Sequence, residues 1–133
     1  MGIEAGLVGE FSTIVNKSDT AAAVAEGLPA ALSTPRVVSM LETTAHSAIA
    51  PYLSAGQTSV GVSLDLRHTA ATPVGMRVRF RLELAEVEGR RLRFKMEAWD
   101  EVEQIASGEH ERFIVDTARF LEKLEKKARG VNK

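Results

Sequence analysis

Apolar and polar residues alternate along three segments in the second half of the chain. Every even position is apolar in residues 60–66, 76–84 and 92–98. This period-two pattern predicts strands that turn one face to a core and the other to water. Further strands are expected at residues 7–16 and at about residues 105–115.

A helix is expected over about residues 35–53. Ser33 and Thr34 are common N-cap residues, and Pro35 suits the first helical position. Pro51 limits the helix near its end. Apolar residues recur on one side at helical spacing, namely Val38, Leu41, Ala45, Ala48, Ile49 and Tyr52.

Two short segments complete the prediction. The Ala-rich stretch 19–32 contains Gly27 and Pro29 and indicates a short helical or irregular lid. Asp116 can cap a charged C-terminal helix at residues 116–129. The apolar side of that helix carries Phe120, Leu121 and Leu124.

The register of the hairpin between residues 76–84 and 92–98 can be predicted from its apolar positions. A two-residue loop at Glu88 and Gly89 would set core positions opposite water-facing ones, whereas a three-residue loop sets Leu84 opposite Phe94. We therefore expect a three-residue, bulged turn. The solvent face then pairs Glu83 with Lys95, Arg81 with Glu97 and Arg79 with Trp99. Its arginine row therefore has local partners and is not a nucleic-acid site.

These elements predict an α+β fold in which an antiparallel sheet wraps around one central helix. We expect one domain over residues 1–133, because the chain shows no repeat and no linker. A single small sheet leaves an edge strand and some apolar area uncovered. A homodimer, or a dimer of dimers, that continues the sheet is therefore expected.

Composition narrows the function. The 133 residues are 44% apolar and 26% charged, with a formal net charge of −1, which argues against a protein that binds nucleic acid or anionic membranes. The absence of cysteine excludes thiolate metal sites and a cysteine nucleophile. The three histidines lack the spacing of a zinc pair, so no metal or other cofactor is expected. With no long apolar run and no visible secretory signal, the expected location is the cytoplasm.

Two ionisable residues occupy unusual positions. Glu42 falls at the edge of the apolar stripe of the predicted helix, where it is either a boundary residue, a partner of an arginine, or a functional carboxylate. His68 shares the parity of the inward-facing residues 60–66 and either bonds to nearby backbone or lines a site. His46, on the helix flank, is interpreted as structural.

Three other residues are weaker candidates. The Thr34 hydroxyl is typical of a helix cap but is also a possible nucleophile. Gly61 marks a bulge or close approach, or offers an N–H to a ligand oxygen. Arg112 forms a surface ion pair or binds an anionic group.

Several of these residues also carry a resemblance to a known family. The segments 34–42, 59–61, 68–73 (His-Thr-Ala-Ala-Thr-Pro), 87–92 (Val-Glu-Gly-Arg-Arg-Leu) and 108–112 (Gly-Glu-His-Glu-Arg) resemble the fluoroacetyl-CoA thioesterase-like branch of the hotdog-fold thioesterases. The likeness spans about residues 7–120, without a gap over residues 34–112. It implies an acyl-CoA substrate and a dimer that joins two sheets and shares active sites across the interface.

The resemblance implies roles for five residues. Thr34 would be the catalytic hydroxyl, with Glu42 and His68 as acid–base partners. Gly61 would donate an N–H near the thioester, and Arg112 would contact the ligand. Members selective for small fluorinated acyl groups carry aromatic residues in the lid, whereas residues 18–32 contain none. We therefore expect a different small or medium acyl group.

The expected activity is hydrolysis of an acyl-CoA thioester to the free acid and CoA. Thr34 attacks the carbonyl, or His68 or Glu42 activates water. Because Thr34 and Glu42 are eight residues apart, about 12 Å in a helix, they cannot touch within it. Either the chain at Thr34 folds back, or two subunits form the site. A non-catalytic acyl-CoA-binding module and an enoyl-CoA hydratase are the alternatives.

Overall fold

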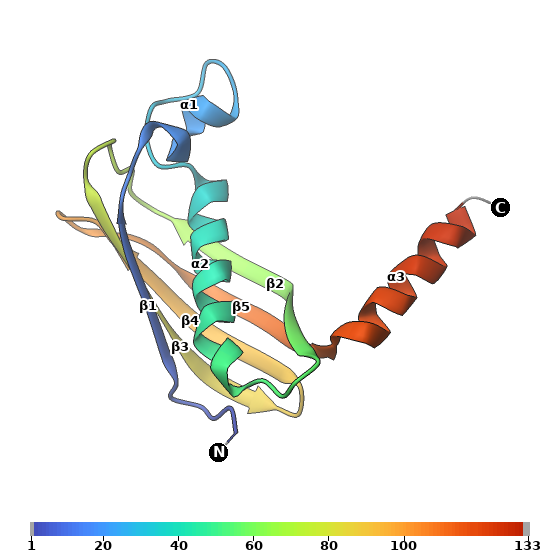
Figure 1. The fold of residues 1–133 in the computed structure, drawn as a ribbon. Helices are drawn as coiled ribbons and strands as arrows, with labels where there is room; N and C mark the ends of the chain where they lie inside the picture. Colours follow the sequence, from blue (N-terminus) through green and yellow to red (C-terminus); the bar gives the residue numbers. More distant parts are fainter. Residues whose placement is uncertain (1, 132–133) are drawn as a thin grey trace.

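Five strands form one antiparallel sheet in the computed structural model, which describes residues 2–131. The order across the sheet is β1-β3-β4-β5-β2. The sheet curves around the long helix α2 (Thr34–Ile49), so the expected α+β architecture is confirmed (Figure 1). The strands are β1 (Val8–Ile14), β2 (Gln57–His68), β3 (Arg77–Glu88), β4 (Arg91–Trp99) and β5 (Gln104–Asp116).

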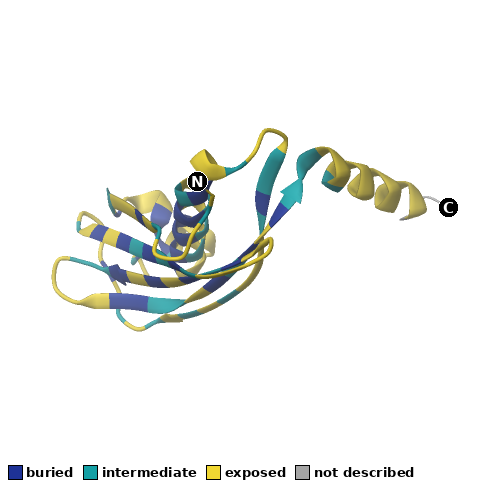
Figure 2. Ribbon diagram, turned by 90° about the horizontal axis from the view of Figure 1, so that it is seen from below, coloured by how far each residue is buried: buried dark blue, intermediate teal, exposed yellow. Residues whose placement is uncertain are grey.

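The core lies between the concave face of the sheet and α2. Alternate residues of β3 and β4 are buried and the others are exposed or half-buried, as the period-two pattern predicts (Figure 2). The buried positions include Val78, Phe80, Leu82 and Leu84 on β3 and Leu92, Phe94, Met96 and Ala98 on β4.

The predicted register of the β3–β4 hairpin is confirmed away from its turn. Leu84 pairs with Phe94, and Arg79 pairs with Trp99 with its guanidinium 4.5 Å from the ring centroid. The predicted three-residue turn is wrong, because β3 and β4 are separated only by Gly89 and Arg90. The extra residue instead sits in a bulge between Leu84 and Glu86. Gly89, with φ of +61°, permits the tight turn, and the bulge restores the facing of the two strands.

The buried side of α2 differs from the predicted stripe. Val37 and Met40 are buried, whereas Val38 is half-buried and Tyr52 is 45% exposed. The sheet wraps around the helix and covers a wider arc than one stripe. The helix also ends before Tyr52, in the 3₁₀ turn η2 (Ala50–Tyr52), which contains Pro51.

The remaining elements lie at opposite ends of α2. The predicted lid contains η1 (Lys17–Asp19) and α1 (Ala21–Val24), and isolated bridges join Thr20 to Leu32 and Ala31 to Pro73. The C-terminal helix α3 (Thr117–Val131) projects away from the sheet (Figure 1). In the described part of the chain, no helix is long and apolar enough to cross a membrane.

Candidate functional site

Thr34 and His68 lie together where α2 begins and β2 ends. The Thr34 Oγ1 and His68 Nδ1 atoms are 2.8 Å apart. The interpretation of Thr34 as the cap is wrong, because the Ser33 hydroxyl accepts the Arg36 backbone N–H at 3.1 Å. The Thr34 hydroxyl is therefore available to the imidazole. A hydroxyl within hydrogen-bond reach of a base is the geometry of an activated nucleophile.

The His68 ring is half-buried and turns inward, as its parity predicts. Its Nε2 atom is buried and has no hydrogen-bond partner among the described residues. Burial lowers the pKa of His68, and the backbone of Ala70 only partly opposes this effect. The neutral imidazole can therefore accept a proton at neutral pH. A buried polar atom without a partner is also a feature that calls for a functional explanation.

A cavity of about 310 Å³ adjoins the Thr34–His68 pair. Its lining comes from the lid, from the start of α2 and from the segment after β2. His68 is the one ionisable residue of that lining, which otherwise includes Ala21, Pro29, Leu32 and Ala70. The cavity therefore offers mostly small apolar side chains next to the hydroxyl.

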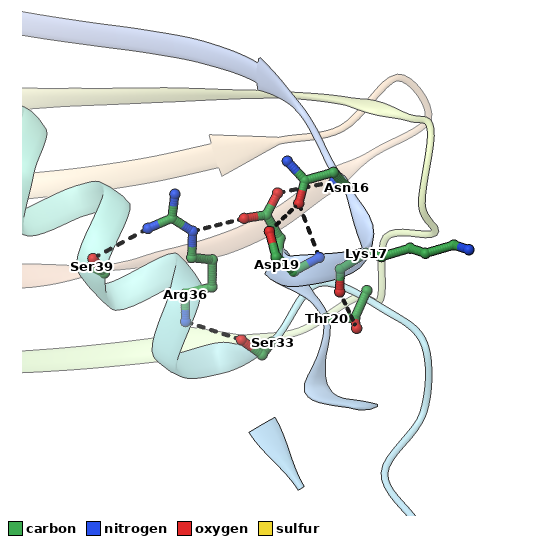
Figure 3. A network of polar contacts seen from close by, with 8 residues as sticks. Asn16, Lys17, Asp19, Thr20, Ser33, Arg36 and Ser39 are labelled. Atoms are coloured by element: carbon green, nitrogen blue, oxygen red, sulfur yellow. Dashed lines mark hydrogen bonds and ion pairs between the residues drawn. The ribbon is translucent and has the colours of Figure 1, made fainter. Parts of the chain in front are cut away.

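An ion pair attaches the lid to the first turn of α2 (Figure 3). The Arg36 Nε atom donates to Asp19 Oδ1 at 2.8 Å, and the Asp19 side chain is 6% exposed. The second carboxylate oxygen accepts the Asn16 backbone N–H at 3.0 Å. The Ser33 backbone N–H also donates to the Asp19 carbonyl at 2.9 Å. These contacts fix the lid beside Thr34.

Glu42 belongs to a second polar cluster, further along α2. The Arg112 Nη1 atom donates to Glu42 Oε2 at 3.4 Å, so the interpretation of Glu42 as a partner of an arginine is confirmed. The Arg112 side chain is 8% exposed, so its interpretation as a surface ion pair is wrong. The Glu42 side chain is 43% exposed. The carboxylate is therefore anchored on one oxygen and accessible to solvent.

Gly61 lies directly against this carboxylate. A Cβ atom at residue 61 would overlap Glu42 Oε2 and would lie 3.5 Å from Arg112 Nη1. Its interpretation as a site of close approach is therefore confirmed, and the pairing of β2 with β5 shifts immediately after it. Only glycine leaves room for the carboxylate here.

This bulge changes which residues of β2 face α2. The expectation that every even position from 60 to 66 faces the core is wrong at Val60, which pairs with the exposed Phe113, and at Val62, which is 55% exposed. Before the bulge, Ser59 and Gly61 face inward, and after it Leu64 and His68 do so. One extra residue therefore brings both odd and even positions to the same face.

Three residues of the second cluster were not predicted as functional. The Ser59 Oγ atom lies 2.8 Å from Arg112 Nε and 2.6 Å from His46 Nδ1. The His110 Nε2 atom lies 3.1 Å from Arg112 Nη1. His110 could have been identified from the sequence, because it lies two residues before Arg112 on the same strand. Ser59 and His46 could not, because they meet only through the bulge in β2.

The five predicted site residues therefore fall into two groups within the chain. Thr34 pairs with His68 at the start of α2, and Glu42, Gly61 and Arg112 meet two turns later. Thr34 is the first residue of α2, so the alternative that the chain folds back there is wrong. Among the described residues, no group of three or more His, Asp or Glu side chains could hold a metal ion.

Known proteins are similar to this chain in sequence and in fold. Residues 15–118 match the family model of the fluoroacetyl-CoA-specific thioesterase FlK. The fluoroacetyl-CoA thioesterase of Streptantibioticus cattleyicolor is 40% identical over 99 residues, which are 74% of this chain and 71% of that protein.

Solved structures agree with that match. A mutant of FlK in complex with fluoroacetate and CoA superposes with a TM-score of 0.83 at 33% identity, covering 89% of this chain and 99% of that one. A Thermus thermophilus hypothetical protein described as a thioesterase superfamily member gives a TM-score of 0.89 at 27% identity, covering 98% of both chains. The chain therefore belongs to the fluoroacetyl-CoA-specific thioesterase family and has its hotdog fold.

Proposed function

We propose that Thr34 and His68 of one protomer and Glu42 of its partner form one reaction centre for acyl-CoA hydrolysis. As a member of its family, the chain is a thioester hydrolase that releases the free acid and CoA. The observation that carries the proposed centre is the 2.8 Å contact between Thr34 Oγ1 and His68 Nδ1. Both residues line the cavity of about 310 Å³, next to apolar side chains.

The chemistry follows from this pair. Neutral His68 accepts the Thr34 proton at Nδ1 while Oγ1 attacks the thioester carbonyl carbon. The tetrahedral oxyanion collapses, and the CoA thiolate leaves and takes the proton from the imidazolium. Water, deprotonated by His68, then hydrolyses the acyl ester on Thr34. Direct activation of water is the alternative, and mass spectrometry of quenched enzyme for an acyl group on Thr34 distinguishes them.

The edge strand β2 favours a shared site. It has twelve residues, lies at one edge of the sheet and exposes Val62 at its bulge. Long unprotected edges tend to pair with another chain. An antiparallel β2–β2 pair with its two-fold axis between Leu64 and Asp65 would set Gly61 of one protomer opposite His68 of the other. Glu42 of one chain would then approach the Thr34–His68 pair of its partner.

The cavity indicates the class of acyl group. Its walls present small apolar side chains and no carboxylate, ammonium or guanidinium group. We propose an uncharged small or medium acyl group. In this centre the Gly61 N–H donates to the thioester oxygen. Arg112 affects the ligand indirectly, by orienting the Glu42 carboxylate. The cytoplasmic location and the absence of a cofactor stay predictions.

The first test measures thiol release from short, aromatic and longer acyl-CoAs, including fluoroacetyl-CoA. We expect turnover of at least one substrate that Thr34→Ala and His68→Ala abolish. Binding without turnover would instead indicate an acyl-CoA-binding module. Loss of enoyl absorbance without free thiol would indicate a hydratase.

A second test asks whether two chains form the site. Thr34→Ala and Glu42→Gln are each expected to keep only a small residual rate, and refolding them together should restore about a quarter of wild-type activity, because half of the dimers carry one intact centre. Thr34→Ala refolded with His68→Ala is the matched control and stays at the residual rate, since both changes then affect the same half-site. A monomer in sedimentation, or no recovery in the first mixture, would contradict the shared site.

A further inference from the structure

The hydroxyl of Ser59 joins β2, β5 and α2 through two hydrogen bonds. Arg112 Nε donates to Ser59 Oγ at 2.8 Å, and His46 Nδ1 lies 2.6 Å from the same oxygen. Arginine can only donate, so the Ser59 oxygen accepts from Arg112. Among the described residues His46 Nδ1 is the one acceptor within reach of the Ser59 hydroxyl, so the hydroxyl proton is assigned to that bond. This assignment makes His46 neutral, with its own proton on Nε2.

Arg112 is held by three contacts besides its bond to Glu42. Its Nε and Nη2 atoms donate to the side chain and the carbonyl of Ser59, the latter at 3.1 Å. Its Nη1 atom donates to His110 Nε2 at 3.1 Å. His110 can accept there because its Nδ1–H donates to the Ser63 carbonyl at 2.8 Å. Since a guanidinium is planar and rigid, these anchors fix where Nη1 meets Glu42.

We propose that His46 is a positioning residue that orients Glu42 by accepting the Ser59 proton and thereby fixing Arg112. The inference rests on the proposed function, because it assumes that Glu42 takes part in hydrolysis. It assigns a role to a histidine that touches neither the cavity nor the Thr34–His68 pair.

Protonation of His46 breaks this arrangement. An Nδ1–H would point at Ser59 Oγ, and the hydroxyl proton would lose its acceptor. The charged group that contacts the His46–Ser59 pair is Arg112 from β5. Behind it lie His110 on the same strand and Glu42 on α2, which both contact Arg112. A second cation would then stand beside Arg112. Burial, followed by the Arg112 charge, lowers the pKa of His46, so the break occurs below the ordinary range of histidine.

The test compares His46→Asn with His46→Leu. Asparagine places a neutral acceptor oxygen near the position of Nδ1, whereas leucine keeps bulk without an acceptor. We expect His46→Leu to lower kcat about tenfold with less than a twofold change in KM, and His46→Asn to keep most of the wild-type rate. In the pH–rate profile of His46→Asn, the fall in kcat toward acid pH should no longer include the protonation of residue 46. Ser47→Ala, exposed on the same helix, is the control.

A double-mutant cycle with Glu42→Gln separates positioning from general damage. If His46 acts through Glu42, then His46→Leu causes no further loss in the Glu42→Gln background. Additive losses, equal losses in His46→Asn and His46→Leu, or full activity of His46→Leu would overturn the inference.

A readout that does not involve activity separates this inference from the proposed function. Nitrogen NMR of the His46 ring at pH 7.5 should show the Nε2–H tautomer with Nδ1 unprotonated. Full activity of Glu42→Gln would remove the role given to Glu42 in the proposed function. An Nδ1–H tautomer would overturn the Ser59–His46 link itself, whatever Glu42 does.

Discussion

Gly61 of β2 leaves the space that the Glu42 carboxylate of α2 occupies, so a side chain at residue 61 and the observed position of Glu42 exclude each other. The two residues are 19 positions apart and belong to different elements. Their contact shows that the edge strand and the central helix are fitted to one another at the second polar cluster.

Gly61→Ala tests this contact. The added methyl must displace the Glu42 carboxylate, and misplacement of a catalytic group on this scale lowers kcat by roughly 10- to 100-fold. Thiol release measures the loss, and circular dichroism checks that the fold is kept. Gly130→Ala in α3, where nothing lies within 4 Å, is the matched control and should leave activity unchanged. An active Gly61→Ala enzyme would contradict a fixed position of Glu42.

Ser33→Ala and Thr34→Ala should separate helix capping from chemistry. Loss of the Ser33 cap lowers the free energy of unfolding by about 1 kcal/mol, and this side chain is not expected to take part in the reaction. Thr34→Ala should lower kcat by roughly a hundredfold or more, with little change in stability. Urea unfolding and thiol release on both variants measure the two effects. A Thr34→Ala enzyme that unfolds like Ser33→Ala but keeps its rate would assign the hydroxyl a structural role.

Asp19→Asn should loosen the lid. The amide cannot form the ion pair with Arg36, and hydrogen bonds to a charged group contribute about 1.5–3 kcal/mol. We expect faster hydrogen exchange of amides in residues 20–32 and a higher KM, with kcat changed less. Lys17→Gln, at an exposed residue of the same turn, is the control. Unchanged exchange in the lid would show that other contacts hold it.

Acid should destabilise the protein in the range where histidines titrate. Burial is the largest cause that lowers the pKa of His46, His68 and His110. Between the lowered pKa and the ordinary value of 6.5, the unfolded chain binds more protons than the folded one, so stability falls as pH drops below about 6.5. Each such group contributes a slope of at most about 1.4 kcal/mol per pH unit.

Urea unfolding at constant ionic strength between pH 7.5 and 5 measures this slope, above the ordinary range of carboxyl groups. His110, which is 1% exposed, is expected to contribute most. A flat or rising free energy of unfolding on acidification would mean that the three imidazoles are not held neutral by the fold.

Much of the fold could be predicted because alternation and helical spacing are local properties of the chain. The registers Leu84–Phe94 and Arg79–Trp99 followed from the need to keep apolar residues on one face. A bulge at Ala85 shifts this register so that it fits the Gly89–Arg90 turn. Its position could not be predicted, because no residue type near Ala85 indicates a bulge. Tyr52 was misplaced because the change from α-helix to 3₁₀ turn at Pro51 rotates it outward.

The residue pattern and composition were enough to predict the strands, the central helix and the absence of thiol chemistry, and they named Thr34, Glu42, His68, Gly61 and Arg112 as candidates. How these candidates group depends on the folded chain, because side chains from three elements meet through the curvature of the sheet and one extra residue in β2. The Thr34–His68 contact joins residues 34 positions apart, and the Arg112–Glu42 contact joins residues 70 apart. No local pattern encodes such distances, since long-range contacts depend on how the whole chain packs.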